Sequence, residues 1–451
     1  MNNRRCCGNY SRSQFLRSAA ARAGRGLPAI EPGMPAPAGT GLTRRGFIAG
    51  AAGLALAVYG ASRTPLPLFD EGIAEAAQAD RILVSVFLDG GADALSLLAP
   101  VGHARYHELR PVLALGPGDG FAFSEDTSLR WHPSASGLAQ LHGEGKVTVF
   151  PAVGYEDANQ SHFTSRHFWE VGELDTAART GWMGRYLDLA GSDTNPLQGL
   201  ALSDSLAPAL ATRSKPVAAV EGITDYDLWS HASEPVSDEM FRSFRRMGAM
   251  NSESPALTES RRAISATNIV RDSLASFKEF QSPVTYPDAR LGHQLSGLAA
   301  LLAAGMPLHC VSVTADGSYD THSDQREEFD GAIKATCDSL LAFQRDLEAR
   351  GLEDRVLVQV YSEFGRRPEE NGSAGTDHGA AGVAFLIGSR ASGKMVGEFP
   401  GLVNLDEDDN LRHTSDFRAM YCSLLEQWFG HDAAPVIPGA AAFARPVLLK
   451  P

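Results

Sequence analysis

Short, continuous apolar runs recur along the chain and predict strands that are buried on both faces, as in a parallel sheet. The runs with this pattern are residues 81–88, 146–153, 216–220, 308–314, 356–361 and 384–388. Stretches of helical periodicity separate them, at residues 136–142, 181–190, 238–250, 260–280, 288–304, 325–350 and 416–429. Strands that alternate with helices in this way are typical of an α/β fold. The sequence therefore predicts a mostly parallel central sheet with helices on both faces.

The helical part of this pattern is uneven. Residues 222–308 are mostly helical and carry no chemical motif, so we interpret them as a helical insertion or layer that packs on the sheet. Residues 80–451 otherwise follow one strand–helix pattern without internal repeats, which predicts a single domain.

The N-terminal residues have a different pattern. Arg44 and Arg45 precede a modest apolar run, residues 49–61, which is typical of a twin-arginine export signal. We expect residues 1–79 to be a disordered extension plus this signal, cut after Ala79, with the twin-arginine translocon as a partner during export. Met34 is an alternative start. The mature protein would then be periplasmic, on the cell surface or secreted.

An uncleaved N-terminal anchor is the other reading of this leader. Its apolar run is shorter than the roughly 20 residues that a membrane-spanning helix needs, which favours cleavage. No other segment of the sequence is apolar enough to span, so we expect no stable membrane span.

Composition removes some classes of function. Acidic residues outnumber basic residues by 54 to 40, and the formal net charge is −14. Such a charge argues against nucleic acid as a partner, because non-specific binding to phosphates needs a basic surface. Cys310, Cys337 and Cys422 follow the leader at spacings that match no zinc motif, and one disulfide among them stays open.

Acidic and histidine residues follow several of the predicted strands. In open α/β sheets, ligands bind just beyond the carboxyl ends of the strands. Carboxylates and neutral histidines are ligands for zinc or manganese, and carboxylates also bind calcium. The candidate metal ligands are Asp89, Asp320, His322, Glu363, Asp377 and His378. The alternatives are a turn that Asp93 caps after the first strand and an Asx-turn at Asp320.

A second candidate group follows the strand at residues 146–153. Ser161 is expected at the start of a helix, where backbone N–H groups and the helix dipole favour an anion. That position suits a serine nucleophile in phosphoryl-type transfer, and the alternative is an ordinary capping serine. His162, Arg166 and His167 support the functional reading, and Arg166 or Arg366 would bind the anion.

These motifs resemble a known family. The segments LDGGADALS, NQSHF, YDTHSDQ, SEFGRRPEENGSAGTDHG and TSDFR, in this order behind the leader, are similar to the bacterial family catalogued as domain of unknown function 1501 (DUF1501). The resemblance covers about residues 80–445. It implies a fold similar to the alkaline phosphatase and sulfatase superfamily, which places two metals at the carboxyl ends of parallel strands.

The resemblance also implies roles for single residues. Asp89 would bind one metal, Ser161 would be the activated nucleophile, and Asp320 with His322 would form the Asp/His pair of the other metal. Glu363 and His378 would take the places of a late Asp and a late His. The chain departs from the superfamily at Phe364, where a histidine is usual, so one ligand is missing unless Asp377 or His162 replaces it.

Two functions follow as hypotheses. The first is an exported, metal-dependent hydrolase that acts on small anionic phosphate or sulfate esters. The alternative is a non-catalytic, secreted binding or assembly protein that keeps a degenerate phosphatase-like site, and Phe364 favours it. Superfolds host many functions, so the fold alone does not decide between them.

Overall fold

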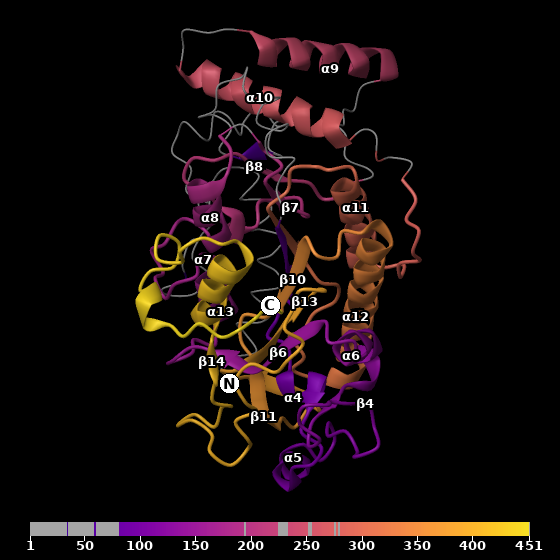
Figure 1. Ribbon diagram of the computed structural model, residues 1–451, viewed down its shortest axis with the longest axis vertical. Coiled ribbons are helices and arrows are strands. Elements are labelled where there is room, and N and C mark those ends of the chain that lie inside the picture. Colours follow the sequence, from indigo (N-terminus) through magenta and orange to yellow (C-terminus); the bar gives the residue numbers. More distant parts are fainter. Residues whose placement is uncertain are drawn as a thin grey trace.

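A nine-stranded sheet forms the centre of the part of the chain that this computed structural model describes (Figure 1). The described residues are 34, 58–59, 81–193, 195–223, 233–250, 255–274, 277 and 280–450. The predicted twin-arginine motif and the cleavage position after Ala79 lie outside them. Among the described residues, none of the helices has the length and apolarity that crossing a membrane requires.

The sheet is mostly parallel, as predicted. Its spatial order is β1 (Val58–Tyr59), β8 (Val217–Ala219), β7 (Gly199–Ala201), β9 (Cys310–Thr314), β2 (Ile82–Phe87), β10 (Val356–Tyr361), β13 (Gly382–Ile387), β6 (Val147–Gly154) and β14 (Ser415–Asp416). Strands β8, β7, β9, β2 and β10 run parallel to one another, while β13 runs antiparallel between β10 and β6. The sequence did not predict β7, because three residues in a loop-rich section carry too little pattern.

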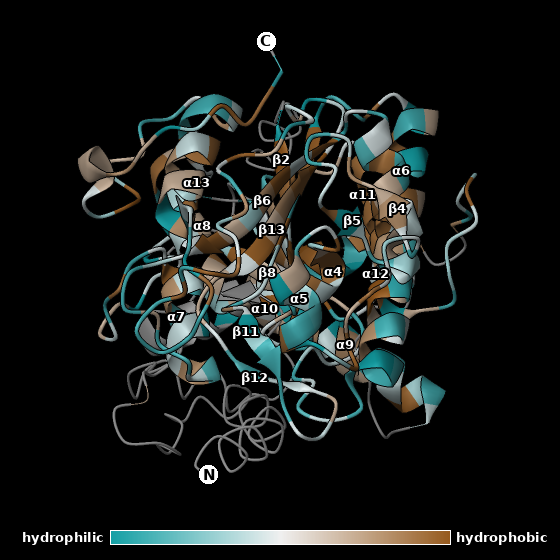
Figure 2. Ribbon diagram, turned by 90° about the horizontal axis from the view of Figure 1, so that it is seen from below, coloured by the Kyte–Doolittle hydropathy of each residue, from teal (hydrophilic) through white to brown (hydrophobic). Residues whose placement is uncertain are grey.

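Helices cover both faces of this sheet, which confirms the predicted α/β class. One face carries α6 (Ser136–Gly143), α11 (Arg290–Ala303) and α12 (Gln325–Arg350), and the other carries α7 (His162–Val171), α8 (Trp182–Ala190) and α13 (Phe417–Ser423) (Figures 1 and 2). A separate hydrophobic core lies on each face of the sheet, and side chains along β2 point alternately into one and the other. Val84 and Val86 pack in the first, whereas Leu83 and Phe87 pack in the second. Every residue of β2 is buried, as its continuous apolar run predicts.

The predicted helical insertion contains two kinds of helix. Helix α11 packs on α12 beside the sheet, whereas α9 (Glu234–Ala249) and α10 (Pro255–Leu274) form a pair at the top of Figure 1, away from the sheet centre. Among the described residues of α9, only Phe244 and Gly248 are buried, and Phe244 forms a small core with Ile264 of α10, whereas Val270 and Leu274 of α10 belong to the main core. The described part of residues 222–308 is therefore mostly helical as predicted, and α11 together with the C-terminal end of α10 packs in the main core.

Small elements gather beyond the carboxyl ends of the parallel strands. They are α4 (Ala94–Leu97), α5 (Ala104–Leu109), a sheet of β3 (Leu98–Ala99), β5 (Arg130–Trp131) and β4 (Phe121–Ala122), and a hairpin of β11 (Arg366–Glu370) and β12 (Thr376–His378). The sequence predicted a glycine-rich loop at this hairpin. The alternation of its residues is too short to reveal strands, and β11 shifts register between Arg366 and Glu370.

The structure also answers whether the cysteines form a disulfide. Cys310, Cys337 and Cys422 are all buried and free, so none of them forms the disulfide that the sequence left open.

Candidate metal centre

The register of the parallel strands brings the polar segments together. Phe87 at the end of β2 pairs with Tyr361 of β10 and with Thr314 of β9. The segments that carry Asp89, Glu363 and Asp320 therefore leave the sheet side by side. Strand β6 ends at the same edge and leads to α7, and the hairpin β11–β12 folds back over this edge.

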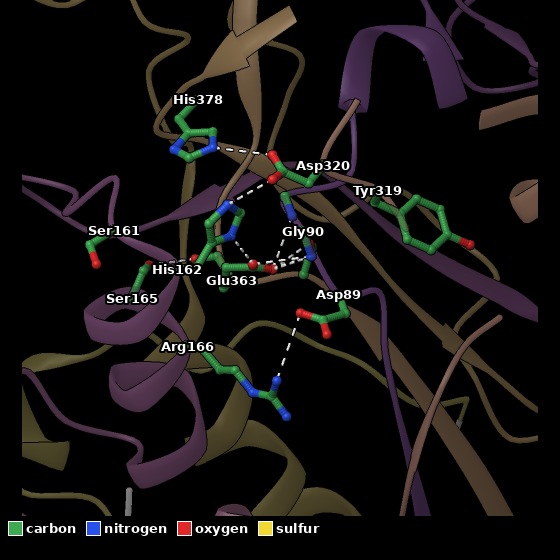
Figure 3. Close-up of polar contacts among 12 residues, drawn as sticks. Asp89, Gly90, Ser161, His162, Ser165, Arg166, Tyr319, Asp320, Glu363 and His378 are labelled. Atoms are coloured by element: carbon green, nitrogen blue, oxygen red, sulfur yellow. Dashed lines mark hydrogen bonds and ion pairs between the residues drawn. The ribbon is translucent and has the colours of Figure 1, made fainter. Parts of the chain in front are cut away.

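Three histidines converge on the carboxylate of Asp320, and Figure 3 shows two of them, His162 and His378. The Nε2 atoms of His322 and His378 lie 3.0 and 3.3 Å from its Oδ1 atom. The Nε2 atom of His162 lies 3.5 Å from Oδ2, and the Nε2 atoms of His322 and His378 are 3.1 Å apart. Residues from α7, from the loop after β9 and from β12 thus meet at one point.

Each of these histidines has an acceptor at its other ring nitrogen. The Nδ1 atom of His162 lies 2.7 Å from Glu363, that of His322 lies 3.1 Å from Asp377, and that of His378 lies 2.8 Å from the Gln160 carbonyl oxygen. An acceptor at Nδ1 favours the tautomer with the proton on Nδ1 and leaves the Nε2 lone pair for a ligand. Three lone pairs and a carboxylate then face one another, an arrangement that a shared cation or protons must stabilise.

This donor set fits a divalent metal. His162, Asp320 and His378 each offer one ligand atom, and these atoms lie within 4.8 Å of one another. The Nε2 atom of His322 adds a fourth donor beside them. Imidazole nitrogens with one carboxylate oxygen suit zinc or manganese, whereas calcium takes six to eight oxygen ligands.

Arg366 forms an ion pair with Asp320. Its guanidinium is fully buried and donates to Asp320 Oδ1 at 2.6 Å. It also donates to the carbonyl oxygens of Gly90, Gly91, Tyr319 and Thr376. Burial alone would raise the pKa of Asp320, but the three neighbouring histidines and the charge of Arg366 outweigh burial and hold that pKa far below its usual range. Asp320 is therefore ionised.

Glu363 lies behind His162 and is already well bonded. Its carboxylate accepts from the backbone N–H groups of Gly90 at 3.1 Å and Gly91 at 3.0 Å, and the Ser362 hydroxyl lies 2.9 Å away. Burial would raise the pKa of Glu363, but the bond to His162 and the hydroxyl lower it. The glycines are needed here, because both have positive φ and a Cβ on Gly91 would overlap the Phe364 ring.

Phe364 fills the space where the superfamily resemblance expects a histidine ligand. Its ring centre lies 4.9 Å from that of His162 and 4.8 Å from that of His378. The side chain of a phenylalanine offers no ligand, so this wall of the site is apolar. It packs the two imidazoles and does not complete a second metal position.

The remaining predicted residues lie around this cluster. Asp89 points away from it toward Arg166, whose guanidinium is 3.7 Å from its carboxylate (Figure 3). Asp377 is half exposed and contacts the outer side of His322. Ser161 is the N-cap residue of α7 and stands at the edge of the group in Figure 3, with no capping bond from its side chain. Asp93 is an N-cap whose side chain accepts from Leu95, so the turn alternative is confirmed there.

The structure thus brings Asp320, His322 and His378 together and sets Asp377 and Glu363 behind two of the histidines. His162 is the residue that sequence reasoning placed least well, since it entered only as support for an anion site or as a replacement ligand. The available signal was its position one residue after Ser161, at a helix start beyond a strand end.

Comparison with known families bears on this site. The family model described as "Protein of unknown function (DUF1501)" matches residues 142–427. The chain belongs to the DUF1501 family. All four residues of the cluster lie within the matched span, whereas Asp89 precedes it. The predicted family membership is confirmed. No curated protein matches the DUF1501 chain.

Solved structures give loose similarities to this DUF1501 protein. The periplasmic domain of EptC from Escherichia coli, in complex with Zn, has a TM-score of 0.38 at 10% identity and covers 81% of this chain and 88% of its own. A protein in the alkaline phosphatase superfamily from Vibrio parahaemolyticus has a TM-score of 0.36 at 10% identity, with coverages of 82% and 70%. The soluble domain of lipooligosaccharide phosphoethanolamine transferase A from Neisseria meningitidis has a TM-score of 0.34 at 11% identity, with coverages of 88% and 98%. Scores of this size transfer neither residue roles nor an activity.

Proposed function

We propose that this DUF1501 protein is an exported, metal-dependent hydrolase of phosphate or sulfate esters. One observation carries the proposal: three imidazole Nε2 atoms, each with an acceptor at Nδ1, face one ionised and partly buried carboxylate. Structural ion pairs rarely need three such rings, whereas metal sites in enzymes commonly use them. The twin-arginine leader in the sequence supports the export part of the proposal.

His162, His322, His378 and Asp320 would hold one divalent ion, with zinc as the first expectation and manganese as the second. Bound there, the ion would supply positive charge that lowers the pKa of a nearby hydroxyl and offsets charge on the ester. Glu363, Asp377 and the Gln160 carbonyl would fix the three rings, and Arg366 would hold Asp320 in place.

Ser161 is the proposed nucleophile. It begins α7, a helix of ten residues whose first backbone N–H groups favour an anion. Its oxygen would form a bond to phosphorus or sulfur while the bond to the ester alcohol breaks, and the alcohol would leave with a proton. Water would then release the anion and restore the serine. Arg166 lies one turn along α7, but Glu170 and Asp89 already balance its charge, so the helix N-terminus and the bound ion are the proposed anion-binding groups.

A non-catalytic metal-binding protein is the second candidate. Glu363 is fully engaged by its donors and Phe364 offers no ligand, so the residues for a second metal are lacking. A single ion with four protein ligands could serve binding without turnover.

One assay separates the two candidates. The purified protein is stripped with a chelator, reloaded with zinc or manganese, and tested for release of phosphate from phenyl phosphate and sulfate from phenyl sulfate. The hydrolase proposal expects turnover that needs the metal and falls to background in His322→Ala and in Ser161→Ala. His293→Ala is the matched control, because His293 is an exposed histidine on α11 that pairs with Asp288. Tight metal binding without any ester hydrolysis would favour the second candidate.

A further inference from the structure

We infer that a pocket beside the histidine cluster binds the organic part of the ester, and that this part is an uncharged, polyhydroxylated ring such as a sugar. The inference rests on the proposed function, whose site it extends. The pocket has a volume of about 310 Å³ and lies at the carboxyl ends of β2, β9 and β10. That volume is near the lower end of the range for small-molecule sites, roughly 300–1,000 Å³, and suits one ring better than a chain.

Helix α7 connects the pocket to the cluster. His162, Arg166 and Glu170 are four residues apart, so they lie on one face of the helix. His162 contacts Asp320, while Arg166 and Glu170 line the pocket. The pocket therefore begins about one helical turn, ~5.4 Å along the axis, from the cluster. Asp89 also lines the pocket and precedes Gly90, which donates to Glu363 (Figure 3).

The charges that line the pocket balance one another. Arg166 lies between Glu170, at 2.9 Å, and Asp89, at 3.7 Å. Arg290 lies 3.4 Å from Asp316 and donates to two backbone carbonyl oxygens. A second anionic group on the ligand would have to compete with these carboxylates. Charge balance therefore favours a neutral group in the pocket.

The remaining lining suits hydroxyl groups on a ring. Four hydroxyl side chains line the pocket together with the carboxylates, namely Ser203, Ser205, Ser312 and Thr314. Such side chains both donate and accept hydrogen bonds, as a polyol requires. Apolar side chains and aromatic rings complete the wall and suit the C–H faces of a ring, namely Leu206, Pro208 and Val313 with the rings of Phe87 and Tyr361. This mixture of hydroxyls, balanced charges and apolar patches identifies the ligand class.

A filling substitution tests the inference. Ser205→Trp places a large side chain in the pocket from a half-buried loop position, and Ser124→Trp is the control on an exposed loop elsewhere. The metal-loaded protein is assayed with a pyranose phosphate monoester and with methyl phosphate. We expect the ratio of kcat/KM for the pyranose ester to that for methyl phosphate to fall about tenfold or more in Ser205→Trp and to stay unchanged in Ser124→Trp. Ala207→Leu, a smaller filling in the same loop, should lower the ratio in the same direction if Ser205→Trp does not fold.

A binding measurement separates this inference from the proposed function. Saturation-transfer NMR with a methyl pyranoside is applied to the chelator-treated wild type and to the variants. Binding that Ser205→Trp abolishes would support the pocket even if the wild type hydrolyses neither ester, in which case only the proposed function fails. The inference would be overturned by a wild type that does not bind the pyranoside, by binding that Ser205→Trp leaves intact, or by equal losses for both esters.

Discussion

At the scale of single residues, the site depends on what holds each histidine. Glu363 is the clearest case. It is buried, contacts His162 and accepts hydrogen bonds from two backbone N–H groups. Its environment makes it a positioning residue in the proposed metal site, with the ligand atom supplied by His162. Asp377, which contacts the Nδ1 atom of His322, is likewise a positioning residue.

Glu363→Gln provides a test at this scale. The amide keeps the size of the side chain but removes the charge that favours the Nε2 lone pair of His162, so we expect zinc affinity to fall about 10- to 100-fold. Isothermal titration with zinc measures the change. Glu369→Gln, an exposed position on β11, is the control and should bind as the wild type does. Equal affinities for both variants would show that Glu363 does not support a metal ligand.

At the scale of elements, one buried ion pair ties the small elements at the carboxyl edge together. Arg110 donates to both carboxylate oxygens of Asp93, at 2.5 and 3.0 Å, and to the carbonyl oxygens of Arg367 and Pro368. Gln325 at the start of α12 also donates to Asp93, at 2.6 Å. The pair thus joins α4, α5, α12 and β11, which carries Arg366.

We expect Asp93→Ala to lower the free energy of unfolding by about 3–5 kcal/mol, because it leaves the Arg110 charge buried without its partner. Denaturant unfolding measures this. Arg105→Ala, which breaks the exposed pair with Glu108, should cost only about 0–1 kcal/mol. Similar costs for both substitutions would contradict the role given to the buried pair.

The pH dependence of this pair follows from its pKa. Burial would raise the pKa of Asp93, but Arg110, Ser96 and Gln325 outweigh burial and lower it below 3.8. A carboxyl whose folded pKa is depressed stabilises the fold above its unfolded pKa, and this contribution is lost as pH falls through the folded pKa. Wild type should therefore lose stability relative to Asp93→Ala only below about pH 4.

The elements also show where sequence reasoning succeeds. Long apolar runs such as residues 81–88 and the amphipathic stretch 325–350 became β2 and α12, because burial fixes their periodicity. The hairpin β11–β12 was predicted as a loop, because its strands are too short to show a periodic pattern and form only through their pairing with each other. Likewise, the positions of Asp320, His322 and His378 after predicted strands placed them at one sheet edge. Only the side-chain geometry distinguished the candidate ligands from Glu363 and Asp377, which lie behind the histidines.

At the scale of the whole molecule, stability is unevenly distributed. Strands β2 and β10 are fully buried at the centre, whereas α9 exposes Val236, Met240 and Met247 and packs mainly on α10. Segments with few buried apolar contacts open at lower free energy than core strands. Helix α9 and the sheet centre should thus behave as separate cooperative units.

Hydrogen exchange tests this expectation. Backbone amides of α9 should exchange through local opening well before those of β2 and β10, which should exchange only through global unfolding. Protection of α9 equal to that of β2 would show that α9 is part of the main cooperative core.

The measurement that bears most directly on the metal centre is the metal content of the purified protein. Elemental analysis after dialysis should find one divalent ion, zinc first, per wild-type chain and in His293→Ala. It should find a strong reduction in His162→Ala and in His378→Ala, because each removes an Nε2 donor that faces Asp320. A folded wild type that binds no metal, even when zinc is supplied, would contradict the account of this site.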